Sequence, residues 1–97
     1  MPFTMLHENY NVQDLDRSLA FYQKALGLTE RRRKTAPDGS FVIVFLGGGA
    51  NSFEMELTWL REHPQPYDLG EQEFHLAFRA DDYAAARALH REMGCIC

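Results

Sequence analysis

Apolar and polar residues alternate along three short stretches of the chain, at 5–12, 52–59 and 73–79. A period of two places successive side chains on opposite faces of an extended segment, so each stretch is predicted to be a half-buried strand. The residues at 28–49 form two further segments joined by Pro37-Asp38-Gly39. This composition is typical of a pair of strands connected by a tight turn.

Two other stretches carry apolar residues at helical spacing. The first stripe consists of Leu15, Leu19, Tyr22 and Leu26, and the second of Ala86, Leu89 and Met93. An aspartate suited to an N-cap precedes each stripe, Asp14 in the first and Asp81 or Asp82 in the second, and a glycine follows it, Gly27 and Gly94. Both stretches are therefore predicted to be capped helices.

The order of these features occurs twice. His7 and His75 are 68 positions apart, and Gly27 and Gly94 are 67 apart. A repeat of this period predicts a duplicated strand–helix–strand–strand–strand unit in an α+β domain. Module one would cover about 5–60, a linker about 61–72, and an incomplete module two 73–97. About thirty residues of the second repeat would then be missing, and Cys95 and Cys97 would begin a buried strand.

Composition narrows the function classes. The formal net charge of −4 argues against nucleic-acid binding, and the one basic run, Arg31–Lys34, is short and typical of a solvated strand edge. The longest apolar run, Phe41–Leu46, is too short to span a membrane, and the first ten residues do not resemble a secretion signal. Two closely spaced cysteines without further partners indicate reduced thiols in a cytoplasmic protein.

Three residues stand out as candidate metal ligands: His7, Glu56 and His75. Each lies in the middle of a predicted strand, on the face opposite the large apolar side chains. Imidazole nitrogens and a carboxylate are suitable ligands for Zn²⁺, Ni²⁺, Co²⁺ or Fe²⁺. A single strand histidine is more often a satisfied structural residue, but the two histidines hold the same place in both repeats. Glu54 shares the face of Glu56, so paired-carboxylate chemistry is also open.

The same residues carry a family likeness. The stretch LHENYNVQDLDRSLAFYQKALGL resembles the opening of glyoxalase I (lactoylglutathione lyase), and MELTW and YDLGEQEFHLAF resemble two later motifs, in the same order and spacing. The resemblance implies the vicinal-oxygen-chelate fold of paired βαβββ modules. It also implies isomerisation of the hemithioacetal of methylglyoxal and a thiol to a lactoyl thioester.

The resemblance implies roles for individual residues as well. His7, Glu56 and His75 would hold a divalent metal, nickel or zinc, with cobalt or iron as alternatives, and Glu56 would also be a catalytic proton carrier. The family implies a homodimer with metal sites shared between chains. Asn11 and Leu60 depart from the glutathione-binding pattern, so a different thiol, or a different glutathione pose using Arg31 to Arg33, remains open. Asn11 and Arg31 are the candidate substrate-binding residues.

Two other interpretations remain. The chain could be another enzyme of the superfamily, such as a ring-cleaving dioxygenase, a thiol transferase or an epimerase. It could also be a metal-free protein that binds a small molecule or confers resistance. Intact His7, Glu56 and His75 favour a metal-dependent enzyme acting on a small-molecule substrate.

Overall fold

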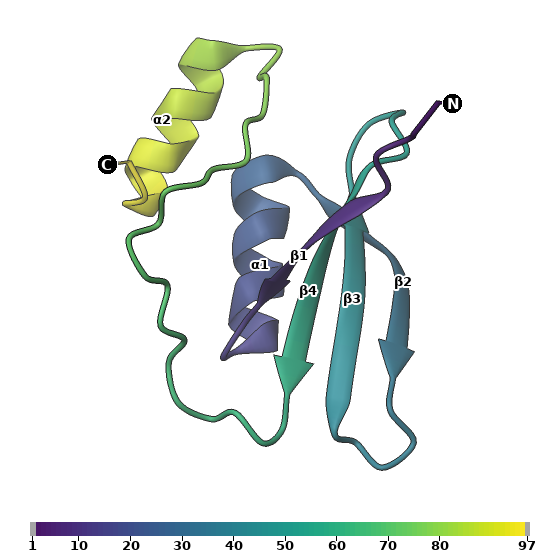
Figure 1. Cartoon of the computed structure of the whole chain (residues 1–97). Coiled ribbons are helices and arrows are strands. Elements are labelled where there is room, and N and C mark those ends of the chain that lie inside the picture. The colour runs from purple at the N-terminus through teal and green to yellow at the C-terminus, as the bar shows by residue number, and fades with distance from the viewer. Residues whose placement is uncertain (1, 97) are drawn as a thin grey trace. The chain divides into compact units, whose positions relative to one another are not determined.

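The computed structural model describes residues 2–96, which form one compact unit up to Tyr67 and a second from Asp68 onwards. The first unit contains β1 (His7–Asn11), α1 (Leu15–Leu26), β2 (Thr29–Thr35), β3 (Phe41–Gly47) and β4 (Glu54–Leu60), and the second contains α2 (Tyr83–Met93) (Figure 1). The α+β class and the complete βαβββ order of module one are therefore confirmed.

The four strands form one sheet in the order β1-β4-β3-β2. β1 runs parallel to β4, and β3 is antiparallel to both of its neighbours. The turn between β2 and β3 is closed by a hydrogen bond from the Gly39 amide to the Ala36 carbonyl, and Gly39 takes the positive φ of 75° that this turn requires. The parallel pair brings the first and last strands of the module together.

The two helices begin and end at the residues that the sequence indicates. The Asp14 carboxylate accepts a hydrogen bond from the Arg17 amide, and the Asp82 carboxylate accepts one from the Ala85 amide. Gly27 and Gly94 end the helices with φ of 66° and 73°, values that glycine adopts without steric cost. Within residues 2–96, no helix is long and apolar enough to cross a membrane.

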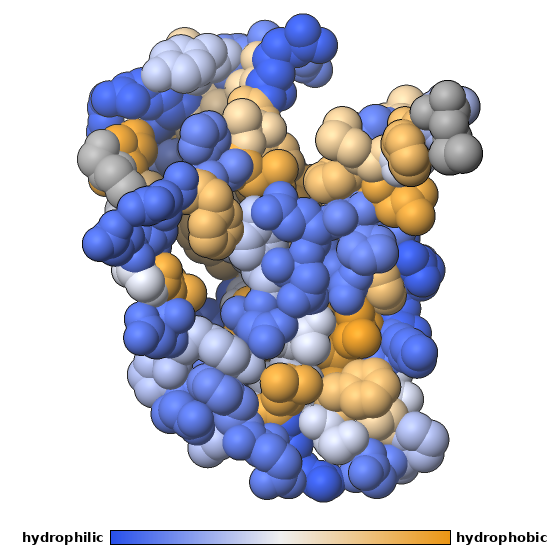
Figure 2. Space-filling view, in the orientation of Figure 1, coloured by the Kyte–Doolittle hydropathy of each residue, from blue (hydrophilic) through white to orange (hydrophobic). Residues whose placement is uncertain are grey.

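The core of the first unit lies between α1 and one face of the sheet. Leu57 and Val44 are fully buried, and Met55, Leu46 and Ala25 are nearly so. Met55 and Leu57 alternate with Glu54 and Glu56 along β4, as the sequence predicts. Because α1 covers the apolar face, the carboxylates of β4 lie on the opposite face. Exposed apolar side chains of the first unit include Phe3, Met5 and Leu6 of the N-terminal segment, and Figure 2 shows that apolar surface is interspersed with polar surface.

The second unit differs from the sequence prediction. Residues 73–79 form no strand, and α2 is the one helix or strand that the structure describes in this unit. A strand exists only when a neighbour accepts and donates its backbone hydrogen bonds, and residues 68–96 contain no strand that could do so. Cys95 likewise lies outside any strand and is only partly buried, so the prediction of a buried strand cysteine was wrong there. Cys97 is outside the described residues.

Candidate metal centre

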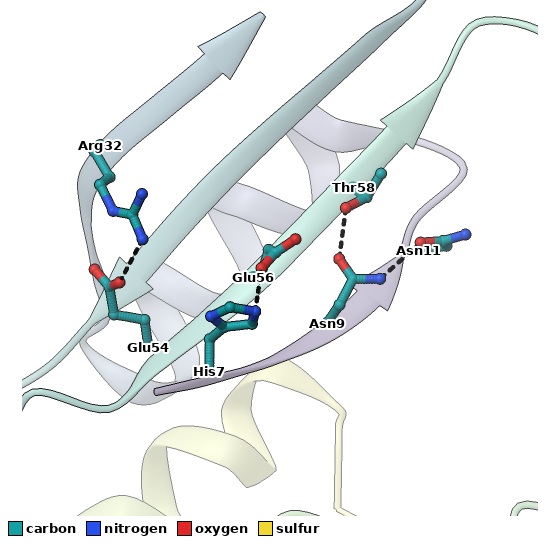
Figure 3. A network of polar contacts seen from close by, with 7 residues as sticks. All are labelled: His7, Asn9, Asn11, Arg32, Glu54, Glu56 and Thr58. Atoms are coloured by element: carbon teal, nitrogen blue, oxygen red, sulfur yellow. Dashed lines mark hydrogen bonds and ion pairs between the residues drawn. The ribbon is translucent and has the colours of Figure 1, made fainter. Parts of the chain in front are cut away.

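The face of the sheet opposite α1 carries a row of polar side chains along its parallel strand pair. In register, His7 lies beside Glu54, Asn9 beside Glu56, and Asn11 beside Thr58. All six are placed on one face because the side chains of each strand alternate and the two strands are aligned in pairs. Figure 3 shows these side chains together with Arg32 from β2.

His7 and Glu56 form the closest contact between two predicted metal ligands. The His7 Nε2 and Glu56 Oε2 atoms are 3.1 Å apart, with side-chain exposures of 44% and 13%. Ligands lie about 2.0–2.2 Å from a bound zinc ion, so neighbouring donors of one ion are about 3.3–3.6 Å apart in a tetrahedral site and about 3 Å apart when they lie at right angles. The separation and the donor types of this pair therefore fit a shared divalent cation.

His75 belongs to the other unit of the chain, so the structure does not assemble it with His7 and Glu56. It lies in the second unit, in a segment without regular structure, and its side chain is exposed. Across residues 2–96, no group of three or more His, Cys, Asp or Glu side chains is assembled that could hold a metal ion. The assignment of His7, Glu56 and His75 as a ligand set thus stays a prediction.

A bulge in β2 changes which basic residues face the candidate site. The register with β3 shifts between Glu30 and Arg32, so that two consecutive arginines lie over the same face. The Arg32 guanidinium stacks on the Phe45 ring, 3.6 Å from its centroid, and its Nη2 donates to Glu54 Oε1 at 3.1 Å. Arg31 extends over Gly47, where a β-carbon would collide with the guanidinium.

Each of the two proposed substrate-binding residues has a defined partner. Arg31 Nη2 donates to the Asn51 carbonyl at 2.8 Å. The Asn11 side-chain oxygen accepts a hydrogen bond from Asn9 Nδ2 at 2.8 Å, and Asn9 in turn accepts from the Thr58 hydroxyl. Both residues therefore lie on the polar face, Arg31 over Gly47 of β3 and Asn11 at the end of β1 opposite to His7. Their role in binding stays a prediction.

Resolved pKa shifts occur away from this face. The guanidinium of Arg33 donates to Glu30 at 2.8 Å and lowers the pKa of the Glu30 carboxyl. Burial, helped by the nearby carboxylate of Glu8, raises the pKa of Tyr10. Glu30 and Arg33 face away from Glu54, because the bulge places Arg31 and Arg32 on the other side of β2.

Comparison with known proteins identifies the family. Residues 4–95 match the Glyoxalase/Bleomycin resistance protein/Dioxygenase superfamily. The chain belongs to this superfamily. It is 40% identical to a lactoylglutathione lyase of Neisseria meningitidis serogroup A over 95 residues, covering 93% of this chain and 67% of the relative. It is 36% identical to the lactoylglutathione lyase of Haemophilus influenzae over 93 residues, covering 93% and 68%.

A solved structure of a glyoxalase supports the same placement. The glyoxalase I of Leishmania major, described as trypanothione-dependent, superimposes with a TM-score of 0.83 at 31% identity. The match covers 96% of this chain and 68% of that protein. The chain thus spans about two thirds of the length of these glyoxalases, and among the enzymes of the superfamily it is of the glyoxalase I type.

Sequence reasoning named Arg31 to Arg33 only as a group, and it missed Phe45, whose ring contacts both His7 and Arg32 on this face. Simple alternation places Arg32 with Glu30 and Lys34, and it gives no sign of the bulge that turns Arg31 to the same side. Phe45 lies in a continuous apolar run, in which neither face can be distinguished by pattern. The one available signal was Gly47, whose missing side chain leaves space for a large neighbour.

Proposed function

We propose that this glyoxalase isomerises the hemithioacetal of methylglyoxal, or a similar 2-oxoaldehyde, and a thiol to the corresponding 2-hydroxy thioester. The observation that carries the proposal is the His7–Glu56 pair, in which two donors suited to a metal lie 3.1 Å apart on adjacent strands. The lactoylglutathione lyases among its relatives support the reaction class. In this reaction a proton moves from the sulfur-bearing carbon to the neighbouring carbonyl carbon, with no net oxidation.

The metal would be held by His7, Glu56 and His75. Nickel or zinc suits this mixed nitrogen and oxygen donor set, with cobalt or iron as alternatives. A bound divalent cation would supply Lewis-acid stabilisation of negative charge on the two adjacent substrate oxygens. We infer that a homodimer with shared sites completes the ligand set, since one unit of this chain carries His7 and Glu56 and the other carries His75.

The chain's own residues would divide the remaining work. Glu56 is the candidate proton carrier, because its largely buried carboxylate is held in place by His7 and a positioned carboxylate can transfer a proton between adjacent carbons. The exposed guanidinium of Arg31 and the amide of Asn11 would bind the polar ends of the thiol. The two closely spaced cysteines, interpreted as reduced thiols, favour a cytoplasmic enzyme.

The test is an isomerase assay on the full chain. Methylglyoxal is pre-equilibrated with glutathione or with trypanothione, Ni²⁺ or Zn²⁺ is added to metal-free protein, and thioester formation is followed by ultraviolet absorbance. Activity that requires added metal and falls at least about a hundredfold in Glu56→Gln, the size expected for a lost proton carrier, supports the proposal. No thioester with any thiol, together with oxygen consumption on catechols, would instead identify a dioxygenase.

A further inference from the structure

Two carboxylates of β4, those of Glu54 and Glu56, lie on the same face of the sheet as His7. Glu54 is the direct neighbour of His7 in register, whereas Glu56 lies two residues further along β4 on the same face. The two glutamates are almost equally shielded from solvent, with side-chain exposures of 14% and 13%. His7 nevertheless contacts Glu56, so some other interaction must hold Glu54 away.

Arg32 supplies that interaction. It projects from β2, crosses β3 by lying flat on Phe45, and reaches Glu54 Oε1 at 3.1 Å. The edge of the His7 ring faces the same phenylalanine, with ring centroids 6.1 Å apart. Phe45 is 7% exposed, and its ring contacts one residue of each pair. One ion pair, Arg32–Glu54, therefore lies beside the other, His7–Glu56 (Figure 3).

We propose that Arg32 is a positioning residue that selects the carboxylate available to the metal. By holding Glu54, it leaves Glu56 as the single β4 carboxylate beside His7. This inference rests on the proposed metal-dependent function. It concerns the ligand set, and it assigns Arg32 no direct contact with substrate or metal.

Charge and geometry both support this role. Two free carboxylates at positions i and i+2 of one strand would repel each other, and each could approach a cation bound at His7. A guanidinium is always charged, and its planar group both stacks on an aromatic ring and binds a carboxylate. The phenylalanine fixes the orientation of Arg32, so the carboxylate that it holds is fixed as well.

The experiment uses Co²⁺ bound to the full metal-free chain, because its visible absorption reports the number of ligands. In Arg32→Gln, Glu54 is released and joins the metal, so the bands should shift and weaken as the coordination number rises. Arg32→Gln combined with Glu54→Gln should restore the wild-type bands, since no second carboxylate remains. Glu54→Gln alone should retain them.

These variants separate positioning from a simple charge effect. Removing a cation near the metal would tighten Co²⁺ binding in Arg32→Gln even if Glu54 never moved, but it would leave the band positions unchanged. Unchanged bands in Arg32→Gln overturn the proposal. A band shift that persists when Arg32→Gln is combined with Glu54→Gln also overturns it, because Glu54 is then not the added ligand. Failure of the wild-type chain to bind Co²⁺ would also overturn it.

The isomerase assay on the wild-type chain is read separately. Wild-type chain that binds Co²⁺ with the expected variant pattern but forms no thioester contradicts the proposed reaction and leaves the positioning role standing. Wild-type chain that forms thioester while Arg32→Gln keeps the wild-type bands contradicts only the positioning role.

Discussion

Replacing Phe45 by leucine tests whether this ring connects the two ion pairs of the site. Phe45 is 7% exposed, the Arg32 guanidinium lies 3.6 Å from its centroid, and the His7 ring meets it edge-on at 6.1 Å. Loss of the cation–π contact should destabilise the fold by about 0.5–1 kcal/mol, because Arg32 is largely exposed. Loss of the His7 contact adds about 0.5 kcal/mol, and the smaller side chain in the core adds up to about 1.5 kcal/mol.

The contribution of the cation–π contact to the unfolding free energy can be isolated by a double-mutant cycle with Arg32→Gln. Urea unfolding is followed by the fluorescence of Trp59, the single tryptophan, which lies in β4 of the first unit. We expect Phe45→Leu to destabilise the wild-type chain by about 0.5–1 kcal/mol more than it destabilises the Arg32→Gln variant. Additive effects, within about 0.3 kcal/mol, would refute the assignment of a stabilising stack.

A matched control is available on the same strand. Phe41 begins β3 and pairs with Leu60 at the far end of β4, about 13 Å along the strand from Phe45. Phe41→Leu should therefore be additive with Arg32→Gln. Coupling of equal size at both phenylalanines would indicate a general effect of the lost charge and not a contact at Phe45.

Three further outcomes are expected. Asp14→Ala should lower the unfolding free energy of the first unit by about 1 kcal/mol, since the helix loses its N-cap acceptor; an unchanged urea midpoint would contradict the capping role. Glu30→Gln should destabilise the fold by less than about 0.5 kcal/mol at neutral pH, because the Arg33 partner is exposed. Since the folded pKa of Glu30 is lowered, its contribution is complete above about pH 5 and disappears as the pH falls below about 4, so the two urea midpoints should converge there. Gly47→Ala should displace the Arg31 guanidinium and break its hydrogen bond to the Asn51 carbonyl, while leaving the backbone intact. The NMR resonance of the Arg31 Nε–H should therefore shift in this variant, and an unchanged resonance would contradict the contact.

Part of the candidate site could be predicted from local pattern. Alternation along β1 and β4 placed His7 and Glu56 on polar faces, and the structure confirms both placements. Alternation could not indicate that Glu54 would pair with Arg32. This ion pair depends on a residue that lies 22 positions away in sequence and reaches across an intervening strand. Pairing between distant strands is decided by tertiary packing, and local periodicity carries no information about it.

In the second unit, the local pattern predicted a strand that the structure does not form. Residues 73–79 have a clear period of two, yet the structure describes no strand there. Phe74 and Phe78, expected on a buried face, are 67% and 51% exposed. Alternation reports which side chains could share a face, but a strand forms only where another strand completes its hydrogen bonds.

The sequence by itself determined the helices, their aspartate caps and glycine ends, the turn at Gly39 and the polar faces of β1 and β4. These features depend on interactions within a few residues, which composition and spacing record directly. Only the tertiary structure decided the parallel pairing of β1 with β4, the bulge that turns Arg31 and Arg32 to one side, and the division of the two glutamates between Arg32 and His7. Those outcomes follow from which strands become neighbours, and the burial of the whole sheet against α1 selects that arrangement.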